Sequence, residues 1–411
     1  MESFLLYLSA FLRPIFFANF AGPTLFELAA VGMFVALALS FLSNAAIRKS
    51  IRITAIDLFI AVFSFWCIAS YLIYFEYGEL REVARLLIPL FTYVVAKNVL
   101  RDDGSYWRMA RFMLWGFALP VTVSAGLILL GKGVEQVGEG PEANYWTGLV
   151  RWEGIYFGAH SMAHNMTFYL MILAMYMTLG RRTSDRGARS RTEVAGLLIV
   201  AAFAVYCLLV SQVRTTLVGA IIFLGVYLYS RSRRLFLVVS AVGAVAAVLS
   251  APILIPKLFP DVVQIERGEA GIDELGSGRL RIWRGNLEYF SHLPIDRQIA
   301  GVGLGNNEAN AGGLDSHNDF LNLFIQTGVV GFLLFATIQL LLLRSILRLP
   351  RDERIVFGAL FIAVALMNLV SNSYISRFGL GQMFYMIMAY VELRKRPDVT
   401  DVARDARVSQ V

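Results

Sequence analysis

The chain has 411 residues, of which 57% are hydrophobic and 16% are charged, and its formal net charge is +7. Soluble domains carry about 25% charged residues, so this composition excludes a soluble enzyme, a disordered protein and a disulfide-rich secreted domain. The apolar runs are continuous and do not alternate with polar residues, which excludes a transmembrane β-barrel. We therefore predict an all-α polytopic membrane protein.

Twelve apolar runs are candidates for bilayer spans, each of which takes about 20 residues of an α-helix. The first run is the weakest, because Arg13 and Pro14 interrupt it. If it does not span, the N-terminus lies outside and the other spans keep their orientation. The runs fall at about 3–21, 24–47, 53–75, 80–98, 109–131, 162–180, 193–211, 215–230, 235–258, 320–344, 355–372 and 377–393.

Lysine and arginine are concentrated in connections that share one side of the membrane if the twelve spans alternate. The positive-inside rule assigns this side to the cytoplasm, so both termini are expected there. The same distribution indicates a protein of the lipid bilayer and argues against a nucleic acid partner. The basic connections are residues 48–52, 181–192, 231–234, 345–354 and the tail from 394.

Two long connections, 132–161 and 259–316, remain on the outer side. The second one contains Leu280, Trp283, Leu287 and Phe290 at helical spacing, after Ser277 as N-cap, which predicts an amphipathic helix at the membrane surface or against the bundle. The predicted division is nine spans over 1–258, a periplasmic loop with the catalytic motifs over 259–319, three spans over 320–393 and a cytoplasmic tail over 394–411.

Arginines on the outer side run against the positive-inside bias, and an anionic ligand would explain them. Arg214 stands at the tip of a tight hairpin in SQVRTTLVG, where a guanidinium would grip a phosphate with two hydrogen bonds or simply snorkel to the interface. The segment GSGRLRIWRGNLEYF holds Arg279, Arg281 and Arg284. Each of these three, taken alone, is more typical of the solvent face of an amphipathic helix than of a ligand site.

The motif DSHNDF places His317 at the mouth of a span, between Asp315 and Asp319. A histidine beside carboxylates is suited to general-base catalysis. Asp315, Ser316 or Asn318 would also cap the helix that follows. The Asp-x-His-x-Asp spacing is compatible with a metal ion, but no second His or Cys cluster supports one, so we predict neither a metal nor a cofactor.

Two further patterns on the outer side are less specific. His160 and His164 are four residues apart, which would place them on one helix face as polar lining residues. The glycines of GVGLG at 301–305 resemble a phosphate-binding loop only superficially, because no strand–turn–helix unit surrounds them. We expect these glycines to permit a tight turn.

Three motifs make the chain resemble the O-antigen ligase and O-antigen polymerase superfamily of bacterial inner-membrane proteins. The first is the hairpin arginine in SQVRTTL. The second is the order Gly-Arg, Trp, Pro and Gly-x-Gly in GSGRLRIWRGNLEYFSHLPIDRQIAGVGLGN. The third is His-Asn followed by a helix with Gly-x-x-Gly in SHNDFLNLFIQTGVVGFLLF. Ligases and polymerases share these features.

The resemblance implies a metal-independent glycosyltransferase with a GT-C-like membrane fold of about twelve transmembrane helices, acting at the periplasmic face of the inner membrane. The donor would be a glycan on undecaprenyl pyrophosphate, and in a ligase the acceptor would be a sugar hydroxyl of lipid A-core. By motif, Arg214 and Arg279 would bind the pyrophosphate and His317 would act at the acceptor hydroxyl. Supporting roles would fall to Arg281, Arg284, Asp315, Asn318, Asp319 and His160.

We favour a ligase, and three alternatives stay open. A polymerase that joins lipid-linked repeat units of O antigen or exopolysaccharide would carry the same motifs. A flippase or transporter of lipid-linked glycans often shows repeated halves and mid-membrane charges, and this sequence shows neither. A peptidoglycan polymerase of the same general fold relies on an acidic catalytic residue in a comparable loop, and the His-Asn motif points away from it.

Overall fold

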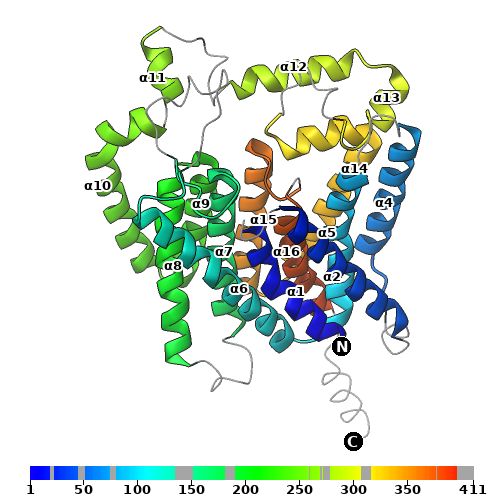
Figure 1. Cartoon of the computed structure of the whole chain (residues 1–411), viewed down its shortest axis with the longest axis horizontal. Helices are drawn as coiled ribbons and strands as arrows, with labels where there is room; N and C mark the ends of the chain where they lie inside the picture. The colour runs from blue at the N-terminus through cyan, green and yellow to red at the C-terminus, as the bar shows by residue number, and fades with distance from the viewer. Residues whose placement is uncertain are drawn as a thin grey trace, which may run out of the picture.

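The structure is a computed structural model that describes residues 1–18, 23–44, 51–74, 80–134, 151–180, 190–258, 260–268, 271, 278–306, 316–375 and 377–395. Over these residues the chain is a bundle of helices, and the one β-type pairing among them is an isolated bridge between Val134 and Trp152. Figure 1 shows the arrangement. In chain order the helices are α1 (Glu2–Phe17), α2 (Pro23–Ser43), α4 (Ala55–Ile73), α5 (Leu80–Val99), α6 (Asp103–Leu129), α7 (Ala159–Leu179), α8 (Arg191–Ser211), α9 (Arg214–Arg231), α10 (Arg233–Leu258), α11 (Pro260–Glu266), α12 (Arg279–Ser291), α13 (Ile295–Ala300), α14 (Asp319–Leu347), α15 (Arg351–Val370), α16 (Phe378–Met388) and the 3-10 helix η5 (Ala389–Lys395).

Each of the twelve predicted apolar runs lies on one of these helices. Among the described residues, five helices are long and apolar enough to cross a membrane by themselves, namely α4, α6, α8, α14 and α15. The all-α membrane architecture is therefore confirmed. The number of twelve spans, the GT-C-like arrangement and the division of the chain into loop and spans remain predictions.

Helix α7 forms the centre of the bundle. Nearly all of its side chains from Ala159 to Leu179 are buried, and it packs against α6, α8, α9 and α15. A helix that is apolar on all sides is stable only where other helices or lipid surround it. Because α7 begins at Ala159, its first turn carries His160 to the end of the bundle that also holds α12.

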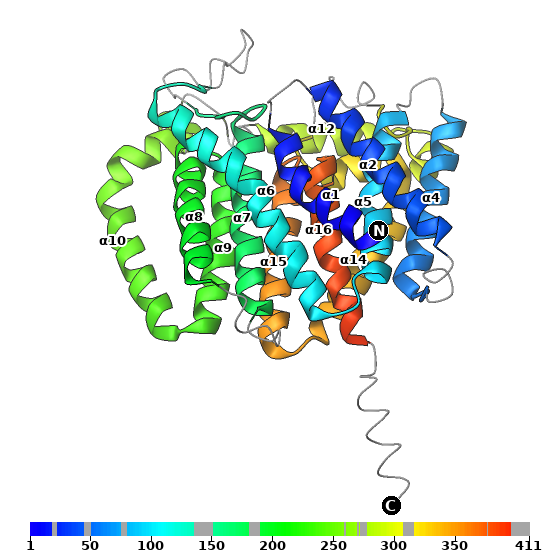
Figure 2. The same cartoon turned by 60° about the horizontal axis from the view of Figure 1, so that its bottom comes forward.

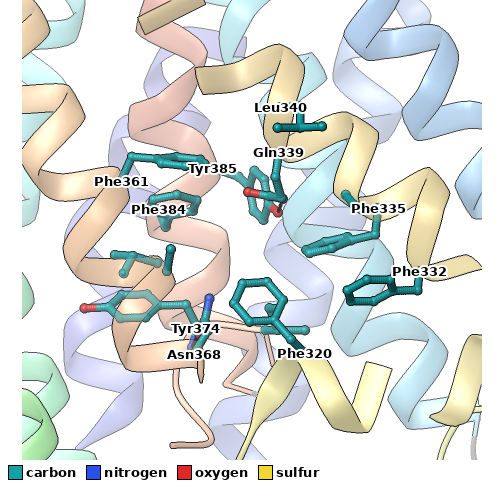
Figure 3. Close-up of a pocket in the computed structure, with 14 residues that line it drawn as sticks. Phe320, Phe332, Phe335, Gln339, Leu340, Phe361, Asn368, Tyr374, Phe384 and Tyr385 are labelled. Atoms are coloured by element: carbon teal, nitrogen blue, oxygen red, sulfur yellow. Dashed lines mark hydrogen bonds between the residues drawn. The ribbon is translucent and has the colours of Figure 1, made fainter. Parts of the chain in front are cut away.

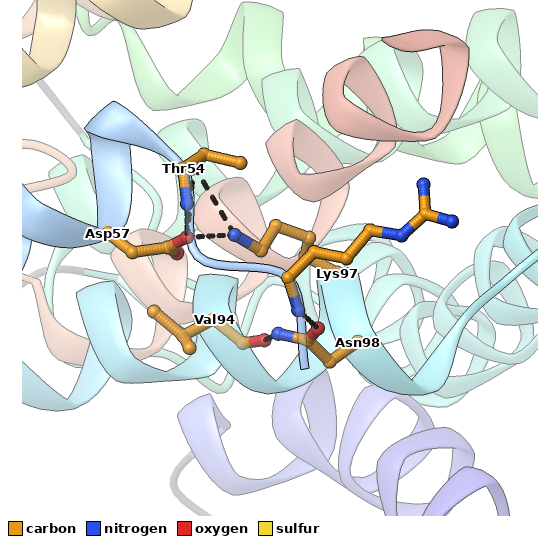
Figure 4. Close-up of polar contacts among 6 residues, drawn as sticks. Thr54, Asp57, Val94, Lys97 and Asn98 are labelled. Carbon is orange, nitrogen blue, oxygen red and sulfur yellow. Dashed lines mark hydrogen bonds and ion pairs between the residues drawn. The ribbon is translucent and has the colours of Figure 1, made fainter. Parts of the chain in front are cut away.

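A buried polar cluster joins the start of α4 to the end of α5 (Figure 4). Thr54 and Asp57 form a capping box at the start of α4, and Lys97 near the end of α5 pairs with the Asp57 carboxylate while only 4% exposed. The side-chain oxygen of Asn98 accepts a hydrogen bond from the backbone N–H of Arg52 at 3.2 Å. These contacts fix α4 and α5 as an antiparallel hairpin.

Helices α12 and α13 lie across one end of the bundle (Figure 1), whereas the turn from α14 to α15 and the end of α16 lie at the opposite end (Figure 2). The predicted amphipathic helix is thus confirmed as α12, with Phe290 buried and Leu280 and Leu287 exposed. The N-cap residue is Gly278, with φ 75°, and the expectation that Ser277 caps the helix is wrong. Ser277 itself is outside the described residues.

Helix α14 bends at Gly328, which has φ 67°. Its first part packs against α12 through Phe324 and Phe290, whose ring centroids are 4.3 Å apart. At the bend the chain touches the turn at Gly301: a Cβ on Gly328 would lie 2.3 Å from the carbonyl oxygen of Ile299, and a Cβ on Gly301 would lie 2.2 Å from that of Gln326. The GVGLG segment is therefore a tight turn, as expected, that supports the bend in α14.

Candidate active site at the α12 end of the bundle

A long-range hydrogen bond joins the loop that carries His317 to α12. The indole Nε1 of Trp283 donates to the carbonyl oxygen of Ser316 at 2.8 Å. The Ser316 hydroxyl is fully buried and lies 2.8 Å from the side-chain oxygen of Asn322 on α14. His317 follows with φ 48° and an exposed side chain. The structure thus presents the imidazole at the surface of this end, on a loop that is fixed from both sides.

Asn318 caps α14, which settles one of the alternatives left by the sequence. Its side-chain oxygen accepts hydrogen bonds from the backbone N–H groups of Phe320 and Leu321 at 3.1 and 3.0 Å. These are orphan donors of the first helical turn, and a cap satisfies them. Asn318 is therefore a structural residue at this position. Asp315, the other flanking carboxylate considered for His317, lies outside the described residues.

Asp319 has a different role from the one its position beside His317 suggested. Its carboxylate is 1% exposed and accepts hydrogen bonds from the backbone N–H groups of Ser373 (2.7 Å) and Ile375 (3.2 Å). It therefore ties the start of α14 to the connection between α15 and α16. Asp319 therefore positions that connection, and its predicted support of His317 stays a prediction.

His164 holds the same connection from the side of α7. Its Nε2 lies 2.7 Å from the Ser373 hydroxyl, and its Nδ1 lies 2.6 Å from the carbonyl oxygen of His160. The rings of His160 and His164 stack with centroids 6.4 Å apart, so both lie on one helix face as expected. Ser373 is thereby fixed by both α7 and α14.

Three arginines from separate parts of the chain act on His160. Removal from water, and then the positive charges of Arg151, Arg377 and Arg279, lower the pKa of His160 well below its ordinary value of 6.5. His160 precedes the apolar run at 162–180. Arg279 is the first residue of α12, Arg151 is 8% exposed, and Arg377 donates from Nε to the carbonyl oxygen of Asn372 at 2.8 Å. Positive charges from three arginines therefore lie near His160, an arrangement that suits an anion.

A buried arginine of α1 contacts the residue that follows Arg377. Arg13 of α1 is 4% exposed, and its guanidinium stands 4.0 Å from the ring centroid of Phe378, the residue after Arg377. In the sequence this arginine only weakens the first apolar run. Arg13, Arg151 and Arg377 were not among the predicted site residues. For Arg377 the outer position of its short connection, against the positive-inside bias, was an available signal.

The remaining predicted arginines occupy the same end of the molecule. Arg214 begins α9, two residues after Gln212, which caps the end of α8 with φ 55° and closes the hairpin. Two residues on, the carbonyl oxygen of Thr216 accepts a hydrogen bond from Thr167 of α7 at 3.4 Å, so α9 enters the bundle next to α7. Arg281 and Arg284 are exposed on α12.

Residues 199–336 match the family model described as O-Antigen ligase. This match, which covers about a third of the chain, confirms the predicted resemblance to the O-antigen ligase and polymerase superfamily. The matched region contains Arg214, Arg279 and His317, whereas Arg13, Arg151 and Arg377 lie outside it. No curated protein matches the chain. Within the described part of the chain, no group of three His, Cys, Asp or Glu side chains is placed to hold a metal ion.

Proposed function

We propose that this protein is an O-antigen ligase of the bacterial inner membrane. It transfers a glycan from undecaprenyl pyrophosphate to a sugar hydroxyl of lipid A-core at the periplasmic face. The family match supports a membrane glycosyltransferase of this superfamily. The arginines at the α12 end lie opposite the basic turn between α14 and α15, which supports a periplasmic position for the site.

The observation that carries the proposal is the hydrogen bond from Trp283 to Ser316. It joins the helix that begins with Arg279 to the loop that carries His317. An anion-binding arginine and a histidine are thereby held within one assembly, which is what transfer from a pyrophosphate to a hydroxyl requires.

The reaction follows from the groups at this end. The bond between the anomeric carbon of the glycan and the pyrophosphate oxygen breaks, and negative charge develops on the pyrophosphate. The positive charges of Arg279 and Arg214 stabilise that charge, because fixed guanidinium groups need no reorganisation when it appears. The acceptor hydroxyl forms the new glycosidic bond, and His317 accepts its proton.

Around this core, Arg151 and Arg377 add positive potential near His160. They hold the pyrophosphate where a low local dielectric strengthens each charge–charge contact. His160 stays neutral near these arginines. Its ring therefore offers a polar atom to the phosphate oxygens or to the sugar.

The acceptor decides between ligase and polymerase. Purified protein in lipid nanodiscs is given undecaprenyl-pyrophosphate-linked glycan together with lipid A-core or with a second lipid-linked glycan. We expect the glycan to appear on lipid A-core, and we expect His317→Ala to abolish transfer. His292→Ala is the matched control, because His292 is an exposed histidine at the end of α12.

Two results contradict the proposal. Transfer to the second lipid-linked glycan and none to lipid A-core would make the protein a polymerase. Transfer to neither acceptor, with intact protein and donor, would remove the glycosyltransferase function.

A further inference from the structure

A cavity of about 260 Å³ lies between α14, α15 and α16 (Figure 3). Its lining is almost entirely aromatic and aliphatic and includes Phe320, Phe332 and Phe335 of α14, together with Ala365 of α15 and Phe384 of α16. Figure 3 shows these side chains around the space, with Phe320, Tyr374 and Asn368 at one end and Leu340, Phe361 and Tyr385 at the other.

Two of the polar side chains in the lining bind each other, one binds the backbone, and the Tyr374 hydroxyl points away from the space (Figure 3). Gln339 donates to the Tyr385 hydroxyl at 2.7 Å, and the Asn368 side-chain oxygen accepts from the backbone N–H of Tyr374 at 2.8 Å. A buried water needs two to four polar partners, which this lining does not offer. The space is therefore suited to hydrocarbon.

One end of the cavity is built from the segments that form the candidate active site. Phe320 follows Asp319, and Ile375 donates its backbone N–H to the Asp319 carboxylate at 3.2 Å. Arg377 is two residues beyond Ile375, and His317 is three residues before Phe320. A molecule in the cavity would thus have its polar end beside cations and its apolar end within the bundle.

Inside a bilayer any hydrocarbon chain can fill an apolar space, because lipid tails are as apolar as the side chains that line it. The charges at the mouth therefore decide the occupant. Arginines favour an anionic head that accepts paired hydrogen bonds, which phosphate and pyrophosphate do.

We infer that this cavity holds the first isoprene units of a polyprenyl pyrophosphate, with the pyrophosphate at the arginines beside His160 and the sugar next to His317. The inference rests on the proposed function and adds the place of the lipid chain. At about 30 Å³ for each water-sized group, a cavity of about 260 Å³ has room for about nine such groups, a little under two five-carbon isoprene units. The rest of the chain would continue into the bilayer.

The test is photolabelling with undecaprenyl pyrophosphate that carries a diazirine in the isoprene unit nearest the pyrophosphate. We expect the label on peptides of α14, α15 and α16 that line the cavity. Ala365→Trp fills the space, and we expect it to reduce this labelling at least tenfold. Leu366→Trp is the matched control, because Leu366 is exposed and does not line the cavity; its labelling should equal that of the parent.

A second pair of variants guards against a folding defect in the first. Ala336→Trp fills the cavity from α14, and Leu333→Trp places the same side chain on an exposed position of that helix. Each protein is compared with the parent by its elution profile and thermal melting. The expected result is loss of labelling in both cavity variants and in neither control.

Several outcomes separate this inference from the proposed function. Labelling outside the cavity, or labelling unchanged by both cavity variants, overturns the inference even if glycan transfer persists. A phospholipid probe that labels the cavity and is not displaced by undecaprenyl pyrophosphate also overturns it. Displaceable cavity labelling in a protein that transfers no glycan supports the inference and removes the ligase function.

Discussion

Trp283 donates its indole N–H to the carbonyl oxygen of Ser316, the residue before His317, over 2.8 Å. The two residues are 33 positions apart in the chain. Because Trp283 lies one turn after Arg279 on α12, the same helix that begins with the arginine also positions the histidine loop. This hydrogen bond and the packing of α12 therefore help to set the relative position of these two groups.

Replacing Trp283 by phenylalanine tests this coupling, since it keeps an aromatic ring and removes the donor. We expect kcat to fall by about ten- to a hundredfold, because a displacement of about 1 Å at a catalytic group can cost that much. The unfolding free energy should fall by only about 1 kcal/mol, the usual net value of a hydrogen bond. Steady-state transfer and thermal melting measure both. An unchanged kcat would separate the α12 helix from the chemistry.

His317→Ala should reduce transfer by about 10²–10⁴-fold, the usual loss when a general base is removed. His317 has φ 48°, a conformation that asparagine tolerates better than most residues. His317→Asn therefore keeps the loop conformation without the base, and we expect it to be as inactive as the alanine variant. A His317→Gln protein that works at close to the parent rate would show that the side chain only orients the acceptor.

Arg279→Lys should be nearly as harmful to transfer as Arg279→Ala, because an ammonium cannot reproduce the two parallel hydrogen bonds of a guanidinium. Folding should be little affected by either change, since a half-buried arginine at a helix start is not part of the apolar core. Arg297→Lys in α13 is the control substitution. Full activity of Arg279→Lys would reduce this residue to a point charge.

Asp319→Ala should detach the connection between α15 and α16. It leaves the backbone N–H groups of Ser373 and Ile375 without their acceptor, and each buried unsatisfied group costs about 1–3 kcal/mol. Asp319→Asn keeps an acceptor oxygen, so we expect most of the stability and most of the activity to return. Melting temperatures and transfer rates of the pair measure this. Complete inactivity of a well-folded Asp319→Asn protein would indicate that the charge itself takes part in catalysis.

His160 predicts a specific dependence of stability on pH. Its pKa is lowered in the folded protein, so the unfolded chain binds a proton that the folded chain does not. Stability should therefore fall as pH drops below about 6.5, the ordinary histidine value. His160→Gln should make this acid-side loss smaller, and His292→Gln should leave it unchanged. Melting temperatures between pH 5 and 8 provide the measurement; parent-like acid sensitivity in His160→Gln would contradict it.

The helices were predictable because the apolar runs, apart from the first, are nearly continuous and have about the length of a span. The hairpin at Arg214 and the helix at Arg279 followed from local patterns that need no knowledge of distant residues. His317 was found for the same reason, as a histidine in a polar loop before an apolar helix. Local sequence thus contains most of what places these three residues at one end of the bundle.

The partners of these residues were not predictable from local patterns. The group around His160 combines charges from Arg151, Arg279 and Arg377, which only the packed helices bring near one another. The direction of the Asp319 side chain was also not predictable. Asp319 lies two residues after His317 in the sequence, but its carboxylate accepts a hydrogen bond from the backbone N–H of Ser373. Spacing along the chain does not indicate which of two neighbouring elements donates hydrogen bonds to a buried carboxylate.

The bend at Gly328 has a consequence for how this protein fits its membrane. Helix α14 has 29 residues and would be about 44 Å long if straight, well beyond the roughly 30 Å of hydrocarbon in a bilayer. Residues 329–347 alone span about 29 Å. The straight part therefore has about the length of the hydrocarbon region, and the end that carries His317 lies before the bend. Membrane thickness would then act on the height of His317 above the hydrocarbon, since a thicker or thinner bilayer tilts the straight part of this helix.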